Sequence, residues 1–459
     1  QDEATVRRRL AEVLARAAED AKSYRPEPGR VILINAGLGA GGAERQVVNT
    51  LLGLKQRGVD VSFVGEYVFG AQELGFFLPV VEGAGISVQQ VPRQFSLTTG
   101  DLGAVSPHLV AMDSLLPGYL LEEIANLVLL LRQRRPEVFH AWQDSTSIKA
   151  AIAAIIVGVP CILVSSRNVN PSNFGYHQPY MRPAYQALAS FPDIVMLNNS
   201  EAGVQDYCRW LNLPRDRYAL VRNGMNFHKL QRANESEQAG FRAAFALPPN
   251  APLMGSIFRF WPEKRPLLWL ECAAALAQEF PAHHFVLAGD GPLKPDMLTY
   301  LDTLPTSVNR RIHVVPPQKD IARMLSALDL FLLVSRFEGT PNVVLEAQWC
   351  GAPVVVTTAG GTAEAILPGK TGLVVRQDTV PALVAACREV LATPAFRNFV
   401  AQEGQRFIST RFGFDRMIGE TLALYDFDTL SRASAQDADD SAEEEDSPVS
   451  LPHLELVNG

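Results

Sequence analysis

Residues 337–346, with the sequence FEGTPNVVLE, combine the features of a phosphate site with two carboxylates. They follow the apolar run LFLLVS, and the pattern predicts that a helix begins near Asn342. Gly339 lets the backbone approach a ligand closely, and the free amides of a first helical turn bind anions such as a diphosphate. Glu338 could accept hydrogen bonds from sugar hydroxyls, and Glu346 could reach a ribose. Alternatively, Glu338 caps the helix and Glu346 is a solvated helical position.

The spacing of the two glutamates carries a family resemblance. Glu338 and Glu346 are separated by seven residues in the setting E-G-x-P-N-V-x-x-E-A. This resembles the paired-glutamate (E-x7-E) motif of retaining GT-B glycosyltransferases, especially those of glycosyltransferase family 4. The similar segments span roughly residues 250–380. They include Gly289-Asp290-Gly291-Pro292, Asp320, Asp329, Gly360-Gly361 and Glu364.

The resemblance implies roles for particular residues of the second half. Arg259 and Lys264 match the basic pair that neutralises the donor diphosphate, although either could be a plain surface cation. The reaction needs such charges, because the leaving nucleoside diphosphate gains negative charge as the sugar carbon becomes cationic. Glu338 would contact the donor sugar and Glu346 the ribose. The remaining donor-binding positions of this half would be Gly339, Thr340, Pro341, Asn342, Val343, Gly360 and Gly361.

A glycine-rich loop in the first half allows two interpretations. Residues 37–42, GLGAGG, follow an apolar run and formally match the dinucleotide fingerprint G-x-G-x-x-G, and Glu66 lies about where such a site needs an acid. However, Gly41 and Gly42, followed by Ala-Glu-Arg, also resemble the family's first-lobe loop beside the donor phosphates. We favour the second interpretation, because a nicotinamide enzyme would leave the motif at residues 337–346 unexplained.

Polar residues that follow other apolar runs of the first half are further candidates. His140 closes the run EVFHAW and is expected to point into the cleft between two lobes, where the family places a histidine near the donor sugar; a structural histidine is the alternative. Asp144, Arg167 and Asn168 are acceptor-side candidates. Residues 222–224, Arg-Asn-Gly, resemble the family's interlobe segment and are predicted to form a hinge.

The elements that must position these residues alternate between buried strands and helices. Apolar runs such as VILINAG, CILVSS, HHFVLAG and APVVVTT are separated by helical stretches, and the alternation restarts after residue 224. This pattern predicts an α/β protein of the GT-B class, with two Rossmann-like, doubly wound parallel-sheet lobes and an interlobe cleft. The predicted parts are a helical extension (1–28), an acceptor lobe (29–221), a donor lobe (222–399), terminal helices packing back on the first lobe (about 400–427) and a disordered acidic tail (431–459).

Composition narrows the setting of the protein. The net charge of the 459-residue chain is −8, and its last 29 residues carry −7 of it, so the body is nearly neutral and offers no basic footprint for nucleic acid. Five scattered cysteines suggest neither disulfides nor a zinc site. Asp437-Ala438-Asp439 matches the metal-binding D-x-D motif, but no apolar strand precedes it, and we predict no metal or other cofactor. The charged N-terminus and the absence of a membrane-length apolar run favour a cytoplasmic protein, with peripheral association at the inner face of the cell membrane as an option.

The resemblance implies a metal-independent hexosyl- or related glycosyltransferase that retains anomeric configuration. The donor would be a UDP- or GDP-type sugar and the acceptor a hydroxyl of a glycan or lipid-linked glycan, in polysaccharide or glycolipid assembly. The leaving phosphate would take the acceptor proton during attack on the same face of the sugar. The alternatives are a nucleotide-sugar epimerase or a phosphorylase of the same fold, or a non-catalytic sugar-nucleotide binding protein.

Overall fold

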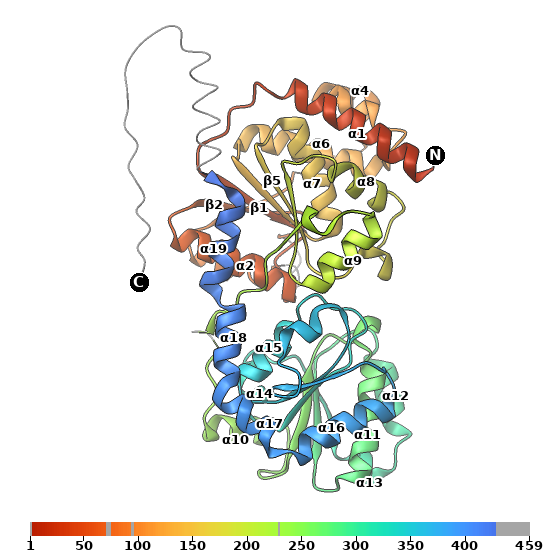
Figure 1. Cartoon of the computed structure of the whole chain (residues 1–459), viewed down its shortest axis with the longest axis vertical. Helices are drawn as coiled ribbons and strands as arrows, with labels where there is room; N and C mark the ends of the chain where they lie inside the picture. Colours follow the sequence, from red (N-terminus) through yellow and green to blue (C-terminus); the bar gives the residue numbers. More distant parts are fainter. Residues whose placement is uncertain (1, 70–74, 93–95, 228–229, 428–459) are drawn as a thin grey trace.

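Two α/β lobes are stacked along the longest axis of the protein (Figure 1). The structure is a computed structural model that describes residues 2–69, 75–92, 96–227 and 230–427. The acidic tail predicted for residues 431–459, with its Asp437-Ala438-Asp439 sequence, lies outside the described residues.

The described part of the first lobe is built on a sheet of seven parallel strands in the order β3-β2-β1-β4-β5-β6-β7. Valine, isoleucine and leucine dominate the central strands, which are buried along nearly their whole length because helices cover both faces. The strands are β1 (Arg30–Asn35), β2 (Asp60–Gly65), β3 (Ser87–Gln90), β4 (Val138–Trp142), β5 (Cys161–Ser166), β6 (Ile194–Asn198) and β7 (Tyr218–Leu220).

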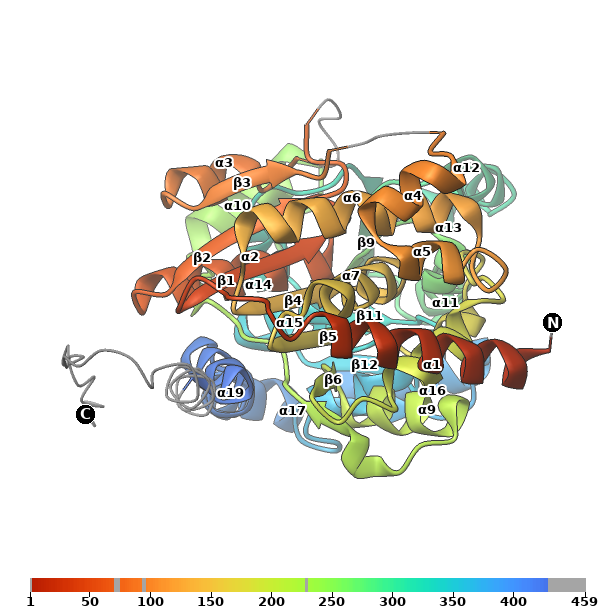
Figure 2. The ribbon, with the colours of Figure 1, turned by 90° about the horizontal axis from the view of Figure 1, so that it is seen from above.

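Helices pack on both faces of this sheet, and the N-terminal extension is one of them. The extension forms α1 (Glu3–Asp20), whose residues Leu10, Leu14 and Ala17 lie on one face and are buried against α7 and α8. Figure 2 shows α1 running across the first lobe beside α7. Helix α1 is therefore part of the first-lobe core. The other helices are α2 (Gly42–Gln56), α3 (Leu78–Gly83), α4 (Thr99–Val105), α5 (Pro107–Ala111), α6 (Gly118–Arg134), α7 (Asp144–Val157), α8 (Met181–Leu188) and α9 (Glu201–Leu211).

The described part of the second lobe repeats this plan with six parallel strands in the order β10-β9-β8-β11-β12-β13. The strands are β8 (Leu253–Ile257), β9 (His284–Ala288), β10 (Ile312–Val315), β11 (Leu330–Leu333), β12 (Val354–Thr357) and β13 (Gly372–Val375). The helices are α10 (Glu235–Ala244), α11 (Pro266–Glu279), α12 (Lys294–Asp302), α13 (Thr306–Asn309), α14 (Ile321–Ser326), α15 (Asn342–Trp349) and α16 (Val380–Ala392). The predicted fold class is confirmed.

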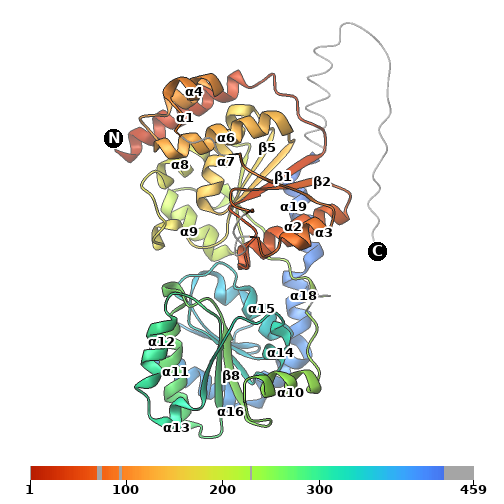
Figure 3. The same ribbon diagram turned by 180° about the vertical axis from the view of Figure 1, so that it is seen from behind.

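The strand order of each sheet reverses at one point, between β1 and β4 in the first lobe and between β8 and β11 in the second. In open parallel sheets, ligands bind beyond the carboxyl ends of the strands at such a reversal. The loops that follow β8 and β11 carry Arg259, Lys264 and Glu338. Figure 3 shows α2 of the first lobe next to α15 of the second, so the corresponding first-lobe loop reaches the same junction.

The terminal helices are divided between the lobes. The sequence predicts that residues from about 400 to 427 pack on the first lobe, but α18 (Gln405–Phe412) buries Ile408 and Phe412 in the second-lobe core. Helix α17 (Pro394–Phe399) lies in the predicted donor lobe and buries Phe396 in the same core. Only α19 (Phe414–Tyr425) joins the first-lobe core. The chain crosses at Gly413, where it pairs with Met225 on the other interlobe strand. Two crossing segments thus lie side by side.

Ile418 anchors α19 on the first lobe, and Ile418→Ala should destabilise that lobe by about 2–4 kcal/mol, because truncation leaves a cavity. The side chain is fully buried, and its Cδ1 would lie 2.4 Å from a Cβ added to Gly53 of α2. Urea unfolding followed by tryptophan fluorescence measures the loss. Gly419→Ala is the matched control, since the space beside Gly419 is open and alanine favours helix. Equal stability of Ile418→Ala and the wild type would contradict this packing.

Candidate functional site

The loop between β11 and α15 places two carboxylates at the junction of the lobes. Helix α15 begins at Asn342, as the sequence predicts, and no described side chain caps its first turn. The Val344 amide donates to the Pro341 carbonyl at 3.1 Å, whereas the amides of Asn342 and Val343 have no acceptor among the described residues and are available to an anion. Glu338 is 7% exposed and Glu346 3% exposed. Glu346 is therefore not a solvated helical position, and Glu338 does not cap the helix, whose N-cap residue is Pro341.

A basic turn after β8 faces this loop. Lys264, at the end of the 3₁₀ turn Pro262–Lys264, forms an ion pair with Glu338. Arg259 keeps 63% of its side chain exposed, and its guanidinium is 3.9 Å from the Glu263 carboxylate. The reversal point of the second sheet therefore combines a buried carboxylate with its paired ammonium and one weakly paired guanidinium. This arrangement can hold a sugar hydroxyl and a phosphate close together.

Glycines allow three backbone segments to meet behind Glu338. Gly360 has φ +51°, and a Cβ placed on it would be 1.9 Å from the Glu338 carbonyl oxygen. The Gly361 amide donates to the Gly339 carbonyl at 3.1 Å. A Cβ on Gly339 would lie 2.3 Å from the carbonyl oxygen of Arg167 in the first lobe. Gly360 and Gly361 open a short 3₁₀ helix (Gly360–Ala365).

The glycine-rich loop of the first lobe contacts α15 directly. Gly41 is the N-cap of α2, and the Gly42 carbonyl accepts a hydrogen bond from the Asn342 side chain at 3.2 Å. Arg45, one turn into α2, forms an ion pair with Glu346. The loop that resembles the family's first-lobe loop thus lies against the backbone amides that are predicted to bind the diphosphate. The two lobes are in contact here.

Five polar side chains, which we call the interlobe cluster, join the lobes next to this contact. Asn223 is central: its Oδ1 accepts from Arg167 at 2.6 Å and from Asn199 at 3.2 Å. Its Nδ2 donates to the Thr340 carbonyl at 3.0 Å and to the Asn342 Oδ1 at 2.7 Å. The Thr340 hydroxyl donates to the Asn199 carbonyl at 2.8 Å. Residues 222–224, predicted as a hinge, therefore also hold the predicted donor loop in place.

Sequence reasoning missed Asn199 and Gln46, which also join this contact. Gln46 Nε2 donates to the Asn342 Oδ1 at 3.3 Å, and its Oε1 accepts from the Gly224 amide at 2.9 Å. Side-chain amides at the end of a strand or in a helix carry no periodic signal. The one available hint is that Asn199 ends the run IVMLNN (residues 194–199), which predicts a buried strand.

The acid required by the dinucleotide interpretation is engaged elsewhere. The Glu66 carboxylate lies 2.5 Å from the ammonium of Lys149, which is also 2.7 Å from Glu123, and it accepts from the Thr146 hydroxyl. This buried ion pair fastens α7 to the end of β2. The Glu66 carboxylate is therefore already bonded and is not free to accept hydrogen bonds from the ribose of a dinucleotide.

Two acceptor-side candidates are tied into the first lobe. Asp144 is buried, and its carboxylate accepts from the hydroxyls of Tyr176 at 3.2 Å, Tyr185 at 2.8 Å and Tyr207. Burial raises the pKa of Asp144, and the three tyrosine bonds oppose that rise. This carboxylate joins the start of α7 to α8 and α9, and its contact with an acceptor stays a prediction. The Asn168 side chain accepts from the Val169 amide at 2.8 Å.

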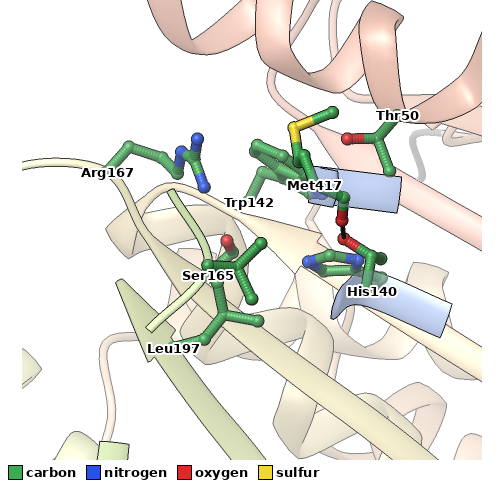
Figure 4. A pocket seen from close by; sticks show the side chains of 9 residues that line it. Thr50, His140, Trp142, Ser165, Arg167, Leu197 and Met417 are labelled. Atoms are coloured by element: carbon green, nitrogen blue, oxygen red, sulfur yellow. Dashed lines mark hydrogen bonds between the residues drawn. The ribbon is translucent and has the colours of Figure 1, made fainter. Parts of the chain in front are cut away.

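His140 also differs from its prediction. It lies in the middle of β4 and is 2% exposed, and its Nδ1 is 3.0 Å from the Tyr425 hydroxyl of α19. Its ring lines a small enclosed cavity together with Trp142, Ser165 and Arg167 (Figure 4). Burial, and secondarily the charge of Arg167, lowers the pKa of His140 to about 3. The side chain faces the base of α19 and not an open cleft, because the strand continues two residues beyond it.

Two other features bear on function. Over residues 2–69, 75–92, 96–227 and 230–427, no group of three or more histidine, cysteine, aspartate or glutamate side chains could hold a metal ion. Within those same ranges, no helix has both the length and the apolar character needed to cross a membrane.

Two Rossmann-like lobes whose sheets reverse toward one junction have the architecture of the GT-B class of glycosyltransferases. Comparisons with known proteins agree. Residues 40–229 match the family model described as Glycosyltransferase Family 4, and residues 251–393 match that of the Glycosyl transferases group 1. The chain belongs to glycosyltransferase family 4.

Named relatives and solved structures extend this result. The Vi polysaccharide biosynthesis protein VipC/TviE of Salmonella typhi is 31% identical over 408 residues, which cover 85% of this chain and 70% of that protein. An Escherichia coli UDP-Gal:alpha-D-GlcNAc-diphosphoundecaprenol alpha-1,3-galactosyltransferase is 27% identical over 52% of this chain and 62% of its own length. The crystal structure of Anabaena HepE in complex with UDP and glucose superposes with a TM-score of 0.69 at 21% identity, over 86% of this chain and 99% of that one.

Closure of the lobes should depend on Asn223. Asn223→Ala removes four side-chain hydrogen bonds, each with a net contribution of about 1 kcal/mol, so the lobes should separate more often. Small-angle X-ray scattering should show a larger radius of gyration for this variant. Asn309→Ala is the control, since that side chain bonds the Leu301 carbonyl within the second lobe. An unchanged scattering curve for Asn223→Ala would refute this role.

His140 should make the protein less stable in mild acid. Its pKa is about 3 in the folded protein, against an ordinary value of 6.5. Below pH 6.5 the unfolded chain therefore binds a proton that the folded protein does not, so unfolding becomes easier as the pH falls. Linkage gives a loss of about 1.4 kcal/mol between pH 8 and pH 5.5. Urea unfolding at the two pH values should show that His140→Gln loses this part of the pH dependence. A variant with the full wild-type slope would contradict the assignment.

Proposed function

We propose that this protein is a retaining glycosyltransferase that moves a sugar from a UDP-sugar to a hydroxyl of a glycan or lipid-linked glycan. The observation that carries the proposal is the Glu338–Lys264 ion pair beside the uncapped first turn of α15, at the reversal point of the second sheet. The second lobe binds the donor in this scheme, and the acceptor enters from the first lobe.

Each group has a chemical task. Lys264 and Arg259 stabilise the negative charge that develops on the leaving diphosphate, together with the amides of residues 339–343. Glu338 accepts hydrogen bonds from donor hydroxyls, and Glu346 does so from the ribose. A double displacement would need a carboxylate close to the anomeric carbon. We favour attack on the same face, in which the leaving phosphate takes the acceptor proton. No metal or other cofactor enters this scheme.

The donor and acceptor classes rest on the relatives. HepE was crystallised with UDP and glucose, and the Escherichia coli relative is named for a UDP-Gal donor and a diphosphoundecaprenol acceptor. The Salmonella typhi relative is named for polysaccharide biosynthesis. These names support a UDP-sugar donor and a role in polysaccharide or glycolipid assembly. Peripheral association with the inner face of the cell membrane is a further part of the proposal.

Arg259 gives the sharpest test of the site, because its exposed side chain is only weakly paired and its loss should not alter stability. Arg259→Ala should reduce kcat/KM about 10²- to 10³-fold, the usual effect of removing one group that stabilises a developing charge. UDP release from UDP-glucose, UDP-galactose and UDP-N-acetylglucosamine measures it, with water or an added glycan as acceptor. Glu338→Gln and Lys264→Ala should lose activity as strongly.

Arg388→Ala is the matched control for Arg259→Ala. Its exposed guanidinium lies 2.8 Å from Glu279 on the outer face of the second lobe, so transfer should be unchanged. Wild-type rates in all three site variants, with normal melting curves, would refute the site.

Proton NMR of the product reads its anomeric configuration. Epimerised UDP-sugar without UDP release, or sugar phosphate formed only with added phosphate, would instead identify an epimerase or a phosphorylase. UDP binding without turnover of any donor would identify a binding protein.

A further inference from the structure

We propose that Arg167 is a phosphate-binding residue that the first lobe contributes to the closed site. The proposal rests on the function proposed above. Arg167 follows β5 directly, and its carbonyl oxygen packs against Gly339 of the predicted donor loop. Its Nη2 donates to Asn223 at 2.6 Å, so the guanidinium lies in the interlobe cluster, one side chain away from Thr340 and Asn342.

The charges at the junction single out Arg167. Three other cations there each have a carboxylate partner: Arg45 pairs with Glu346, Lys264 with Glu338, and Arg222 with Glu364. Arg167 has none within 4.0 Å among the described residues. A cation that is largely removed from water and has no anion is costly unless a ligand supplies one.

The surroundings of the guanidinium are polar but not anionic. The Cζ atom of Arg167 lies 4.4 Å from the ring centre of Trp142, and this cation–π contact compensates only part of the cost of burying the guanidinium charge. The side chain of Arg167 lines the cavity of Figure 4, and its Nε has no hydrogen-bond partner among the described residues. The same holds for His140 Nε2, Trp142 Nε1 and Ser165 Oγ, which belong to side chains at most 2% exposed. Burial lowers the pKa of Arg167 to about 9, which still leaves it charged at neutral pH.

Phosphate is the anion that fits this position. The planar guanidinium fork binds phosphate oxygens through paired hydrogen bonds. The segment that Arg167 packs against, from Gly339 to the uncapped first turn of α15, is itself suited to phosphate. Arg167 also bonds Asn223, so a phosphate held here would join ligand occupancy to lobe closure. The phosphate belongs either to the donor diphosphate or to a phosphorylated acceptor, and the two sources are experimentally separable.

The test compares Arg167→Gln with the wild type by isothermal titration. Glutamine keeps an N–H donor for Asn223 and removes the charge. Arg217→Gln is the matched control: Arg217 is a partly buried arginine of the same lobe that bonds the carbonyls of residues 189, 191 and 194, and it has no acid partner in the described ranges. The probes are UDP, uridine, and inorganic pyrophosphate added with and without saturating UDP.

The expected result is a roughly tenfold or larger rise in the Kd of UDP for Arg167→Gln, with uridine unchanged and the control unaffected. That result assigns the donor diphosphate. Unchanged UDP binding with pyrophosphate binding lost in the UDP-saturated protein also supports the proposal and assigns an acceptor phosphate. Equal binding of both anions by wild type and Arg167→Gln overturns this proposal alone. If the wild type binds pyrophosphate through Arg167 but does not bind UDP, only the proposal of a UDP-sugar donor is overturned. If the wild type binds neither pyrophosphate nor UDP, the proposed donor and the proposed role of Arg167 are both overturned.

Discussion

The side-chain amide of Asn223 is the centre of the polar contact that joins the two lobes of this glycosyltransferase. It accepts hydrogen bonds from the first lobe and donates to the loop and helix that carry the predicted donor site. The donor loop is therefore positioned from behind by the other lobe. Glycines at 339, 360 and 361 make this possible, because any side chain there would keep the backbones apart. The complete site exists only while the lobes touch.

The energetics of this contact favour motion. The junction is made of polar hydrogen bonds, each with a small net contribution, and of buried ion pairs whose desolvation offsets much of their attraction. By contrast, α19 is fixed to the first lobe by apolar packing of Met417 and Ile418, and α18 is fixed to the second by Ile408 and Phe412. A change in the angle between the lobes therefore requires backbone rotation in the two crossing segments, at Met225 and Gly413, while the apolar core of each lobe stays intact. Closure around a ligand needs this combination of rigid lobes and a weakly held junction.

The sequence predicts the parts of this protein that follow local rules. Apolar runs define the strands, and the start of α15 follows from the residues around Asn342. It does not predict contacts made across the chain: Arg45 and Glu346 are 301 positions apart, and Asn223 has no periodic signal. The placement of His140 and Asp144 differs from the expected one for a single reason. A polar residue near the end of a strand is expected at the cleft, whereas both side chains turn into the first lobe and contact tyrosines there.

The balance of charge at the junction limits how a nucleotide sugar can bind. Glu338 and Glu346 are paired with Lys264 and Arg45 in the closed form, so in the proposed site each of these cations shares its charge between its glutamate and the diphosphate. Further positive charge would come from the weakly paired Arg259, from the free amides of α15, and from Arg167, which has no acid partner among the described residues. Arg259 belongs to the second lobe and Arg167 to the first. A diphosphate neutralised by both would hold the lobes together, so charge neutralisation and the exclusion of water would occur in one step.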